Sequence, residues 1–382
     1  MNRLVYLLSS DFWSSPGFGP QHPLRLERLQ RTHELLEAYD AFSAPDVTVL
    51  APRLASEDEL ATHHTREYIA VVRRLSAADY SWQRDLDWWN GEMLLAAKYG
   101  LGPGDNPAFA GMYELYARSV GGALMGAELL AAGQADVAFN VGGGLHHGGP
   151  DYASGFCIFS DVVIAIRWLV AHGLRVAYVD MDVHHADGVQ NAFFDTDRVL
   201  TISLHETGRV LFPGTGFVEE IGTGAGEGYC VNLPFPPLTD GSLYLPAFEA
   251  IVPPLVRRFA PDVLVTQLGA DTHYRDPLAD LRLTTADHLR LHQHFAALSP
   301  GKWLALGGGG YDLGVVPRSW ALAFSVMRGE PFPDLLPAAY RERYLGEHLI
   351  DPETVLLRAA DRAAVAHEVD EMVAQARRLH GV

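Results

Sequence analysis

The stretch Asp180-Met181-Asp182-Val183-His184-His185-Ala186-Asp187-Gly188 decides the fold, because it crowds three carboxylates and two imidazoles onto the end of an apolar run. The preceding residues, 174–179, predict a buried strand. If the chain stays extended beyond that strand, its side chains alternate, and Asp180, Asp182 and His184 point to one side. Burying such a cluster is costly unless a cation lies within it. The spacing is typical of metal ligands, and the alternative is a solvated, Asp-rich turn between a strand and a helix.

Other polar segments follow other predicted strands in the same way. Strands are predicted near Val5 and at 47–50, 137–141, 175–179, 199–204, 263–268 and 303–306, and helices at 24–39, 112–132, 162–171, 243–259, 287–298 and 315–327. This alternation predicts an α/β fold, with a central parallel sheet and helices on both faces. Polar segments at 142–147, 180–188, 203–205, 269–271 and 307–311 come directly after strands. We expect them to meet at the carboxyl edge of the sheet, where open α/β sheets bind ligands.

The chain has 382 residues, of which 48% are hydrophobic, so it can bury a large core. Its length alone would allow two or three domains, but it contains no linker, low-complexity block or fixed-period repeat. We therefore expect a single catalytic domain over 1–382. Its C-terminal helical segment at 352–380 either docks on the domain or forms a dimer contact. Residues 76–107 fit the alternation poorly and predict a long loop.

The formal net charge of −18 argues against general affinity for nucleic acid or for anionic membranes, and it suits a cationic or polar substrate. Two cysteines, Cys157 and Cys230, cannot form a disulfide framework in a chain of this size. No apolar run has the length of a signal-peptide core or a membrane span. These features predict a cytoplasmic protein that would hold a metal through His and Asp rather than through thiolates.

Eight motifs in order resemble the zinc-dependent histone deacetylase family, and within it the bacterial acetoin-utilisation deacetylases. They are His22-Pro23-Leu24-Arg25, Asp105-Asn106-Pro107, residues 142–147, Gly155-Phe156-Cys157, residues 180–188, residues 211–216, Gly269-Ala270-Asp271-Thr272 with Asp276-Pro277-Leu278, and residues 307–311. The resemblance implies an arginase/deacetylase-like fold. It also implies a zinc-dependent amidohydrolase that removes acetyl or related acyl groups from the ε-amino group of lysine in proteins.

The metal ligands implied by the resemblance are Asp182, His184 and Asp271, which leave coordination positions open, as a catalytic zinc requires. Bound zinc would lower the pKa of a water molecule to roughly 7. Iron(II) is the alternative metal in the cell. Taken by itself, Asp271 also has the sequence position of a turn residue or helix cap after a strand.

The catalytic residues implied by the resemblance begin with His146 and His147, paired with Asp180 and Asp187 respectively. A carboxylate on the far nitrogen fixes the imidazole tautomer and stabilises positive charge. His147 would then be the general base and later the proton donor, and His146 mainly an electrostatic partner. Without the family pattern, two neighbouring histidines are equally typical of a protein core or a surface.

Tyr311, after four glycines, would donate a hydrogen bond to the developing oxyanion. A glycine-rich loop that ends in an aromatic residue is also typical of phosphate-binding loops.

The implied substrate-binding residues form a narrow apolar tunnel and its rim. Gly155, Phe156, Phe212 and Leu278 would line the tunnel, and Asp105 would hold the substrate backbone, although Asp before Asn-Pro is also a turn signal. A potassium site is implied by the resemblance at the end of the central strands. Its members are Asp180, Asp182, His184, Ser203 and Leu204.

The segment His273-Tyr274-Arg275 is polar and bulky where eukaryotic members of the family have small residues. It resembles the acetoin-utilisation branch and favours a bacterial metabolic protein, such as an acyl-CoA synthetase, as the partner. Three alternatives remain: an acetylpolyamine amidohydrolase, a non-catalytic acyl-lysine binder, and an arginase-like ureohydrolase. The last would need a second aspartate where His273 stands.

Overall fold

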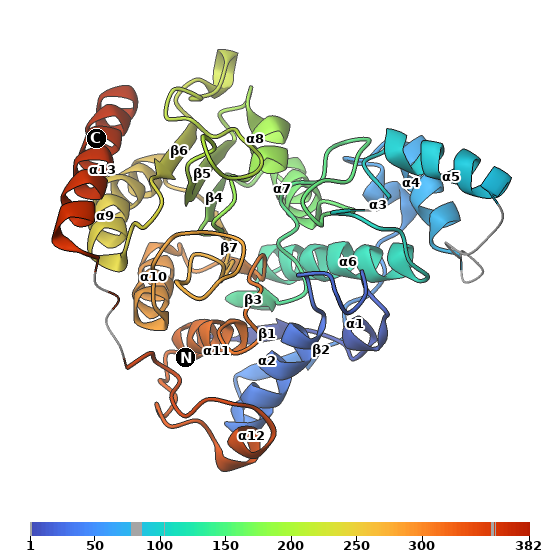
Figure 1. The fold of residues 1–382 in the computed structure, drawn as a ribbon, viewed down its shortest axis with the longest axis horizontal. Helices are drawn as coiled ribbons and strands as arrows, with labels where there is room; N and C mark the ends of the chain where they lie inside the picture. Colours follow the sequence, from blue (N-terminus) through green and yellow to red (C-terminus); the bar gives the residue numbers. More distant parts are fainter. Residues whose placement is uncertain (1, 78–85, 103, 353–354, 356) are drawn as a thin grey trace.

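Eight parallel strands form one sheet, in the order β2-β1-β3-β8-β7-β4-β5-β6 (Figure 1). The computed structural model describes residues 2–77, 86–102, 104–352, 355 and 357–382. The strands are β1 Leu4–Leu7, β2 Val47–Leu50, β3 Val137–Asn140, β4 Val176–Asp180, β5 Val199–Glu206, β6 Cys230–Phe235, β7 Val263–Gln267 and β8 Trp303–Leu306. All the pairs are parallel, which confirms the predicted sheet.

Helices occupy most of the connections between the strands. They are α1 Asp11–Ser14, α2 Glu27–Ala38, α3 Glu57–Leu60, α4 Arg66–Leu75, α5 Leu86–Lys98, α6 Met112–Ala131, α7 Asp161–Ala171, α8 Asp187–Phe193, α9 Gly241–Phe259, α10 Thr285–Leu298, α11 Val316–Arg328, α12 Ala338–Arg343 and α13 Ala359–His380, with 3₁₀ turns at Ala41–Ser43 and Gly224–Gly226. The six helices predicted between strands are present, with ends that differ by three residues or fewer.

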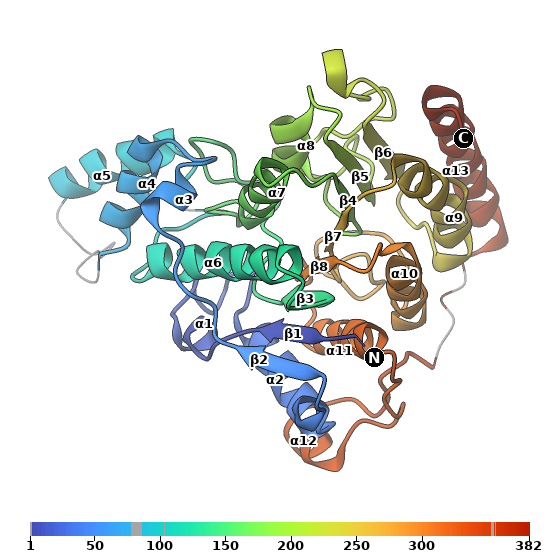
Figure 2. The same ribbon diagram turned by 180° about the vertical axis from the view of Figure 1, so that it is seen from behind.

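Both faces of the sheet are covered, as the alternation predicts. Leu4 and Tyr6 of β1 enter a core shared with α2, α9, α10 and α11, whereas Val5 and Leu7 enter a second core shared with α6, α7 and α8. The front and back views show these two helical layers on either side of the strands (Figures 1 and 2). Most strands are buried on both faces, whereas the edge strand β2 is partly exposed, with Val49 41% exposed.

Strand β6, helix α5 and the shorter helices α1, α3, α4, α8 and α12 were not predicted. β6 contains Asn232 and Pro234, which interrupt its apolar run, and proline is tolerated there because β6 lies at the edge of the sheet. The prediction of a long loop at 76–107 is wrong over α5, where Glu92 to Lys98 are mostly strong helix formers preceded by Asn90 and Gly91. Residues 78–85, which belong to the same prediction, lie outside the described part of the chain.

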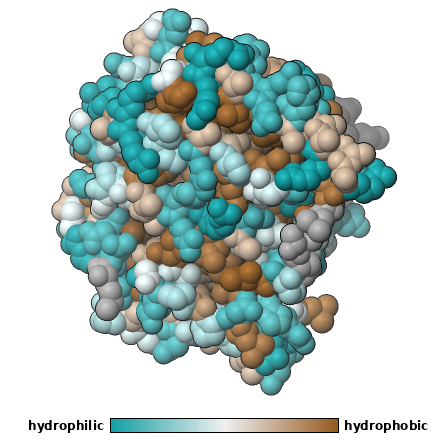
Figure 3. Space-filling model, turned by 90° about the vertical axis from the view of Figure 1, so that its left-hand side faces the viewer, coloured by the Kyte–Doolittle hydropathy of each residue, from teal (hydrophilic) through white to brown (hydrophobic). Residues whose placement is uncertain are grey.

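The C-terminal helix α13 docks on its own chain, against α9 and the edge strand β6. It begins at Ala359, so the prediction of a helical segment from 352 is wrong for the described residues before Ala359. Its inner face buries Val365, Val369 and Met372, and this covers a sheet edge that would otherwise present unpaired backbone groups. Hydrophilic residues cover much of this side of the molecule, with apolar residues in small separate groups (Figure 3). Within the described residues, no helix combines the length and hydrophobicity needed to cross a bilayer.

Candidate active site

The predicted polar segments converge at the carboxyl edge of the sheet. β3, β8, β7, β4 and β5 are consecutive in the sheet, and the predicted segments 142–147, 269–271 and 307–311 follow β3, β7 and β8, while 180–188 begins at the last residue of β4. The predicted segment 203–205 lies within β5, which continues to Glu206, rather than after it. Backbone hydrogen bonds join three of these loops, since Gly308 N donates to Gly143 O at 2.9 Å and Ala270 N donates to Gly309 O at 3.0 Å. The sheet therefore places one polar site at this edge.

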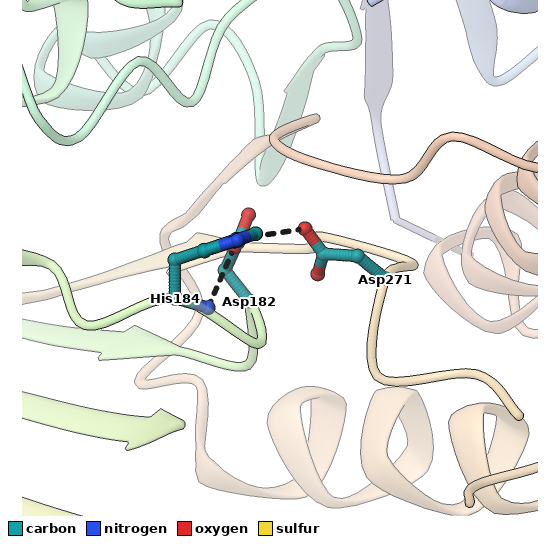
Figure 4. Close-up of side chains that lie close together, drawn as sticks. All are labelled: Asp182, His184 and Asp271. Carbon is teal, nitrogen blue, oxygen red and sulfur yellow. Dashed lines mark hydrogen bonds and ion pairs between the residues drawn. The ribbon is translucent and has the colours of Figure 1, made fainter. Parts of the chain in front are cut away.

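Three buried side chains form a cluster that could hold a metal ion. Ligand atoms of Asp182, His184 and Asp271 all lie within 4.8 Å of one another (Figure 4). His184 Nδ1 lies 3.1 Å from Asp182 Oδ1 and 3.4 Å from Asp271 Oδ2. Asp182 and His184 are on the loop after β4, and Asp271 is on the loop after β7, the neighbouring strand. Within the described residues this is the metal-ligand cluster of the chain.

The cluster fits a divalent cation. Asp271 Oδ2 is buried and has no hydrogen-bond partner, while Asp271 Oδ1 accepts from Val183 N at 2.8 Å. A Cβ at Gly309 would lie 2.0 Å from Asp271 Oδ2 and 2.6 Å from Asp182 Oδ2, so only glycine leaves this space open. Two carboxylates and one imidazole are ligands that Zn²⁺ accepts in catalytic sites, and iron(II) accepts the same types.

The pKa shifts of Asp182, His184 and Asp271 indicate that positive charge is stabilised in the cluster. Burial and the facing Asp182 raise the pKa of Asp271 to about 6. Burial opposes protonation of His184, yet Asp182 and Asp271 raise its pKa to about 10. Burial likewise opposes ionisation of Asp182, but His146 and His184 hold its pKa well below the ordinary value. A cation among these ligands would satisfy both carboxylates.

His146 and His147 each bond to the carboxylate that was predicted for it. His146 Nδ1 lies 2.7 Å from Asp180 Oδ2, and His147 Nδ1 lies 2.6 Å from Asp187 Oδ1. Although burial opposes protonation of His146, Asp180 and Asp182 raise its pKa to about 9. Burial and the neighbouring His146 lower the pKa of His147 to about 4, against the effect of Asp187. The pair therefore offers one cationic and one neutral imidazole at neutral pH.

The pKa values of Asp180 and Asp187 are shifted in opposite directions. Burial raises the pKa of Asp180, which accepts from His146, from Tyr178 Oη and from the backbone N of Asp182. The hydrogen bond from His147 outweighs burial at Asp187 and lowers its pKa. Each carboxylate orients one imidazole, and the far nitrogen of His146, Nε2, lies 3.8 Å from Asp182 Oδ1.

Tyr311, on the loop after β8, lies close to the metal-ligand cluster. Its ring centroid is 6.5 Å from that of His184 and 5.8 Å from that of Phe156. Burial, together with Asp271 and Asp182, raises the pKa of its phenol well above the ordinary value, so the group stays a hydrogen-bond donor. The backbone N of Tyr311 donates to Asp276 Oδ2 at 2.9 Å, and this hydrogen bond fixes the position of the Tyr311 backbone at the end of the glycine-rich loop.

Aromatic rings wall the approach to the cluster. The Phe212 ring is 5.0 Å from His147, and Phe156 packs edge-on against Tyr311. Gly155 makes this possible, because a Cβ there would lie 2.3 Å from the His147 ring and its φ is +50°. Phe156 itself has a φ of 67°, rare for a bulky residue, and Asn106 Oδ1 accepts from its N–H at 2.8 Å.

Asp105 and Leu278 are the other predicted substrate-binding residues. Asp105 is exposed, beside Asn106, and its carbonyl oxygen lies 3.1 Å from His22 Nε2. Leu278 is half-buried, and its N–H donates to Asp276 Oδ1 at 3.0 Å. Their contact with substrate stays a prediction.

The predicted potassium site also gathers in one place. Asp180 of β4 and Ser203 of β5 are register partners, and Leu204 follows on β5. Asp182 and His184 continue from β4, so all five residues lie at the carboxyl ends of two adjacent strands. The identity of a cation bound there stays a prediction.

His273 does not contribute to the metal-ligand cluster. Its Nε2 lies 2.7 Å from Asp351 Oδ2, on the C-terminal side of the chain. The arginase-like alternative requires an aspartate at position 273 that would bind a second metal ion. The residue there is histidine, and among the described residues it does not belong to the metal-ligand cluster.

Three residues of the site were missed in the sequence. Gln267 donates to Asp182 Oδ2 at 2.5 Å, Asp276 holds Tyr311, and Arg28 donates to Gly310 O at 2.9 Å. Arg28 and Cys157 help to line a cavity of about 20 Å³ behind the histidines. Burial lowers the pKa of Arg28 and raises that of the Cys157 thiol, which is typical of an inert buried cysteine. Nothing in the local pattern of α2 marks Arg28, because a helix normally carries arginine on its exposed face.

Comparison with known proteins agrees with this geometry. Residues 22–327 match the histone deacetylase domain. The acetoin utilization protein AcuC of Bacillus subtilis is 42% identical over 339 residues, which cover 86% of this chain and 83% of the relative. AcuC of Staphylococcus aureus (strain MRSA252) is 38% identical over 337 residues, covering 87% of this chain and 83% of the relative.

Solved structures show the same fold. A histone deacetylase homologue from Aquifex aeolicus superposes with a TM-score of 0.85 at 28% identity, covering 98% of this chain and 100% of the other. A histone deacetylase homologue complexed with SAHA superposes with a TM-score of 0.83 at 27% identity, covering 98% and 99%.

Proposed function

Because the chain belongs to the histone deacetylase family, we propose that it is a zinc-dependent hydrolase that removes the acetyl group from the ε-nitrogen of lysine in proteins or peptides. The family assignment gives a deacetylase related to the acetoin utilization proteins. The metal and the lysine substrate are the parts that we propose.

One observation carries the proposal. The buried Asp271 Oδ2, which lacks a hydrogen-bond partner, faces His184 Nδ1 at 3.4 Å beside Asp182. The rings of His147 and Tyr311 both lie near the same cluster, with centroids 6.0 Å and 6.5 Å from that of His184. Acyl transfer to water needs such a set: an electrophile, a base and an oxyanion donor around one small volume.

When bound to Asp182, His184 and Asp271, a divalent ion would polarise the amide carbonyl and make a water molecule more acidic. His147 takes a proton from the attacking water, because its lowered pKa keeps it neutral and ready to accept. The Tyr311 phenol donates a hydrogen bond to the carbonyl oxygen as negative charge develops. His147 then returns its proton to the departing amine, with Asp187 holding the imidazole in place.

The aromatic walls favour a linear acyl-lysine. Phe156 and Phe212 lie on either side of the approach, against Tyr311 and His147, and a methylene chain fits between flat rings better than a branched group does. One similar structure is complexed with SAHA, a linear hydroxamate, and we expect this chain to bind it as well. An acyl-CoA synthetase is the partner that we propose, and potassium at Asp180, Ser203 and Leu204 is part of the same proposal.

The test compares substrates on the purified protein loaded with zinc or with iron(II). We expect kcat/KM for an acetyllysine peptide to exceed that for acetylputrescine by at least tenfold, and SAHA to inhibit. The matched control is His147→Gln, which keeps the fold and an acceptor oxygen but removes the base. Loss of general-base catalysis costs about 10²–10⁴-fold. A metal-loaded protein that turns over no acyl-lysine, from acetyl to longer chains, contradicts the proposal and favours an acyl-lysine binder.

Acetylpolyamines are the second candidate substrates. The net charge of −18 favours a cationic substrate, and these compounds need the same hydrolytic chemistry. A preference for acetylputrescine in the same assay would select this alternative.

A further inference from the structure

A residue beyond the match to the histone deacetylase domain joins the loop that carries a metal ligand. The match ends at residue 327, whereas Asp351 lies in the segment between α12 and α13. Its side chain is only 5% exposed. A buried carboxylate this far from the established motifs requires partners, because an unpaired buried charge is strongly unfavourable.

The Asp351 carboxylate has four such contacts, to three residues in three different elements. Its Oδ2 lies 2.7 Å from His273 Nε2 and accepts from Thr285 N at 2.8 Å and Thr285 Oγ1 at 3.0 Å. Its Oδ1 accepts from Arg318 Nη1 at 2.7 Å. The hydrogen bond from His273 and the charge of Arg318 outweigh burial and lower the pKa of Asp351. The carboxylate thus joins the loop after β7, the start of α10 and the first turn of α11.

The tautomer of His273 is fixed by its own loop. Arg275 N donates to His273 Nδ1 at 3.1 Å, so the proton is on Nε2 and points to Asp351. The ring is fully buried. An imidazole held at both nitrogens is a rigid connection between Asp351 and the backbone of the loop after β7.

His273 lies between two groups of the active site. Two residues before it, Asp271 faces the metal-ligand cluster. The carbonyl oxygen of His273 accepts from Asp276 N at 2.8 Å, and Asp276 Oδ2 in turn accepts from Tyr311 N at 2.9 Å. Displacing the His273 ring would therefore shift the metal ligand at one end of this loop and the anchor of Tyr311 at the other.

We propose that Asp351 is a positioning residue for the active site, which acts through His273 to fix both Asp271 and the Asp276–Tyr311 contact. This inference rests on the proposed function for its catalytic readout, but not for its metal-binding readout. It gives the segment after residue 327 a role in the chemistry, in addition to its packing.

The test uses Asp351→Asn in the full chain, with Asp334→Asn as the matched control. Asp334 also lies beyond residue 327, between α11 and α12, and its carboxylate bonds to His348 Nδ1 at 2.7 Å and accepts from Ile350 N at 2.9 Å. The Asp334 and His348 side chains are 49% and 43% exposed, and asparagine keeps the oxygen that accepts from Ile350 N. We expect Asp351→Asn to lower zinc affinity, measured by competition with a chelating dye, and kcat by about tenfold each, since outer partners of metal ligands have effects of 10–100-fold. KM should stay within about twofold, because no substrate-contacting group is altered. Asp334→Asn should change none of these.

A milder variant keeps the test decisive if Asp351→Asn does not fold. Thr285→Val preserves shape and leaves the Asp351 charge in place, but removes the two hydrogen bonds between Thr285 Oγ1 and Asp351. We expect a smaller loss of zinc affinity and kcat, by about threefold. Wild-type zinc affinity and kcat in the folded variant, with only a lower Tm, would overturn the inference. If the wild-type protein turns over no acyl-lysine, the proposed function fails, while the zinc titration still tests Asp351.

Discussion

Two buried regions of this molecule are built from opposite kinds of residue. The active site encloses Asp182, Asp271 and His184 with almost no exposure, whereas α13 buries Val369 and Met372 against the edge strand β6 and α9. Burying charge costs stability, while burying apolar surface supplies it. The comparison teaches that burial alone does not show what a residue does: we expect the first region to determine activity and the second to determine stability.

The sharpest test of this contrast is Asp271→Asn. We expect loss of zinc binding and no detectable turnover, because one of three ligands is neutralised. The metal-free variant should nevertheless be as stable as metal-free wild type or more stable, by roughly 1–3 kcal/mol at pH 7.5. Because the pKa of Asp271 is raised to about 6, its protonated carboxyl contributes fully to folding stability below about pH 4. This contribution is lost as the pH rises through 6, so at pH 7.5 the metal-free protein buries an unfavourable carboxylate.

Urea unfolding of both proteins in excess chelator measures this difference. Asn keeps an oxygen to accept from Val183 N, so a cavity or a lost hydrogen bond cannot produce the result. Marked destabilisation of metal-free Asp271→Asn would show that the metal-ligand cluster also stabilises the fold. The active site and the α13 contact would then not differ in their effect on stability.

Tyr311→Phe is expected to have the next largest effect. Removing one oxyanion donor lowers kcat by about 10²–10³-fold. The ring contacts with Phe156 and His184 survive, so zinc affinity and Tm should stay at their wild-type values. Single-turnover kinetics with zinc-loaded protein checks this, and an unchanged rate would remove Tyr311 from the mechanism.

In the apolar region, Met372→Ala should reverse the pattern. Truncating this buried side chain leaves a cavity between α13 and its neighbours and should cost about 2–4 kcal/mol of unfolding free energy. We expect wild-type kcat and zinc affinity at temperatures where the variant is folded.

The adjacent Glu371→Ala is the matched control, because that side chain is 69% exposed. It should change stability by no more than about 0.5 kcal/mol. A fall in kcat with Met372→Ala would indicate that α13 is coupled to the active site.

The two regions were also unequally predictable from the sequence. Asp182 and His184 alternate on an extended segment after an apolar run, so local periodicity predicted that they point to one side. Asp271 was assigned by the resemblance to the family, because the sequence does not show that its strand, β7, lies beside β4. The fold class followed from the same alternation. β6 was missed because Pro234 and Asn232 break the apolar run of an edge strand, and α5 was missed because Asn90 and Gly91 break its period.

Residues that act through distant contacts could not be predicted in this way. Arg28 reaches Gly310 across 282 positions, and Asp351 reaches His273 across 78. Neither residue belongs to a local pattern that differs from an ordinary helix face or a loop. Only the packing of α2, α11 and the C-terminal segment onto the sheet gives these side chains their partners.

The smallest expected effect separates two histidines within the active site itself. His147, with a pKa lowered to about 4 by burial and by His146, stays neutral as the pH falls through 6.5. His146, with a pKa raised to about 9 by Asp180 and Asp182 against burial, keeps its proton up to that pH. At pH 6 only about 1% of His147 is protonated, so changing from pH 7 to pH 6 should leave the fraction of active base almost unchanged.

Imidazole nitrogen chemical shifts of ¹⁵N-labelled protein, assigned with His147→Gln, measure the protonation of both histidines directly. If His147 instead titrates near 6.5, the two imidazoles are electrostatically alike, and the assignment of base and electrostatic partner loses its basis.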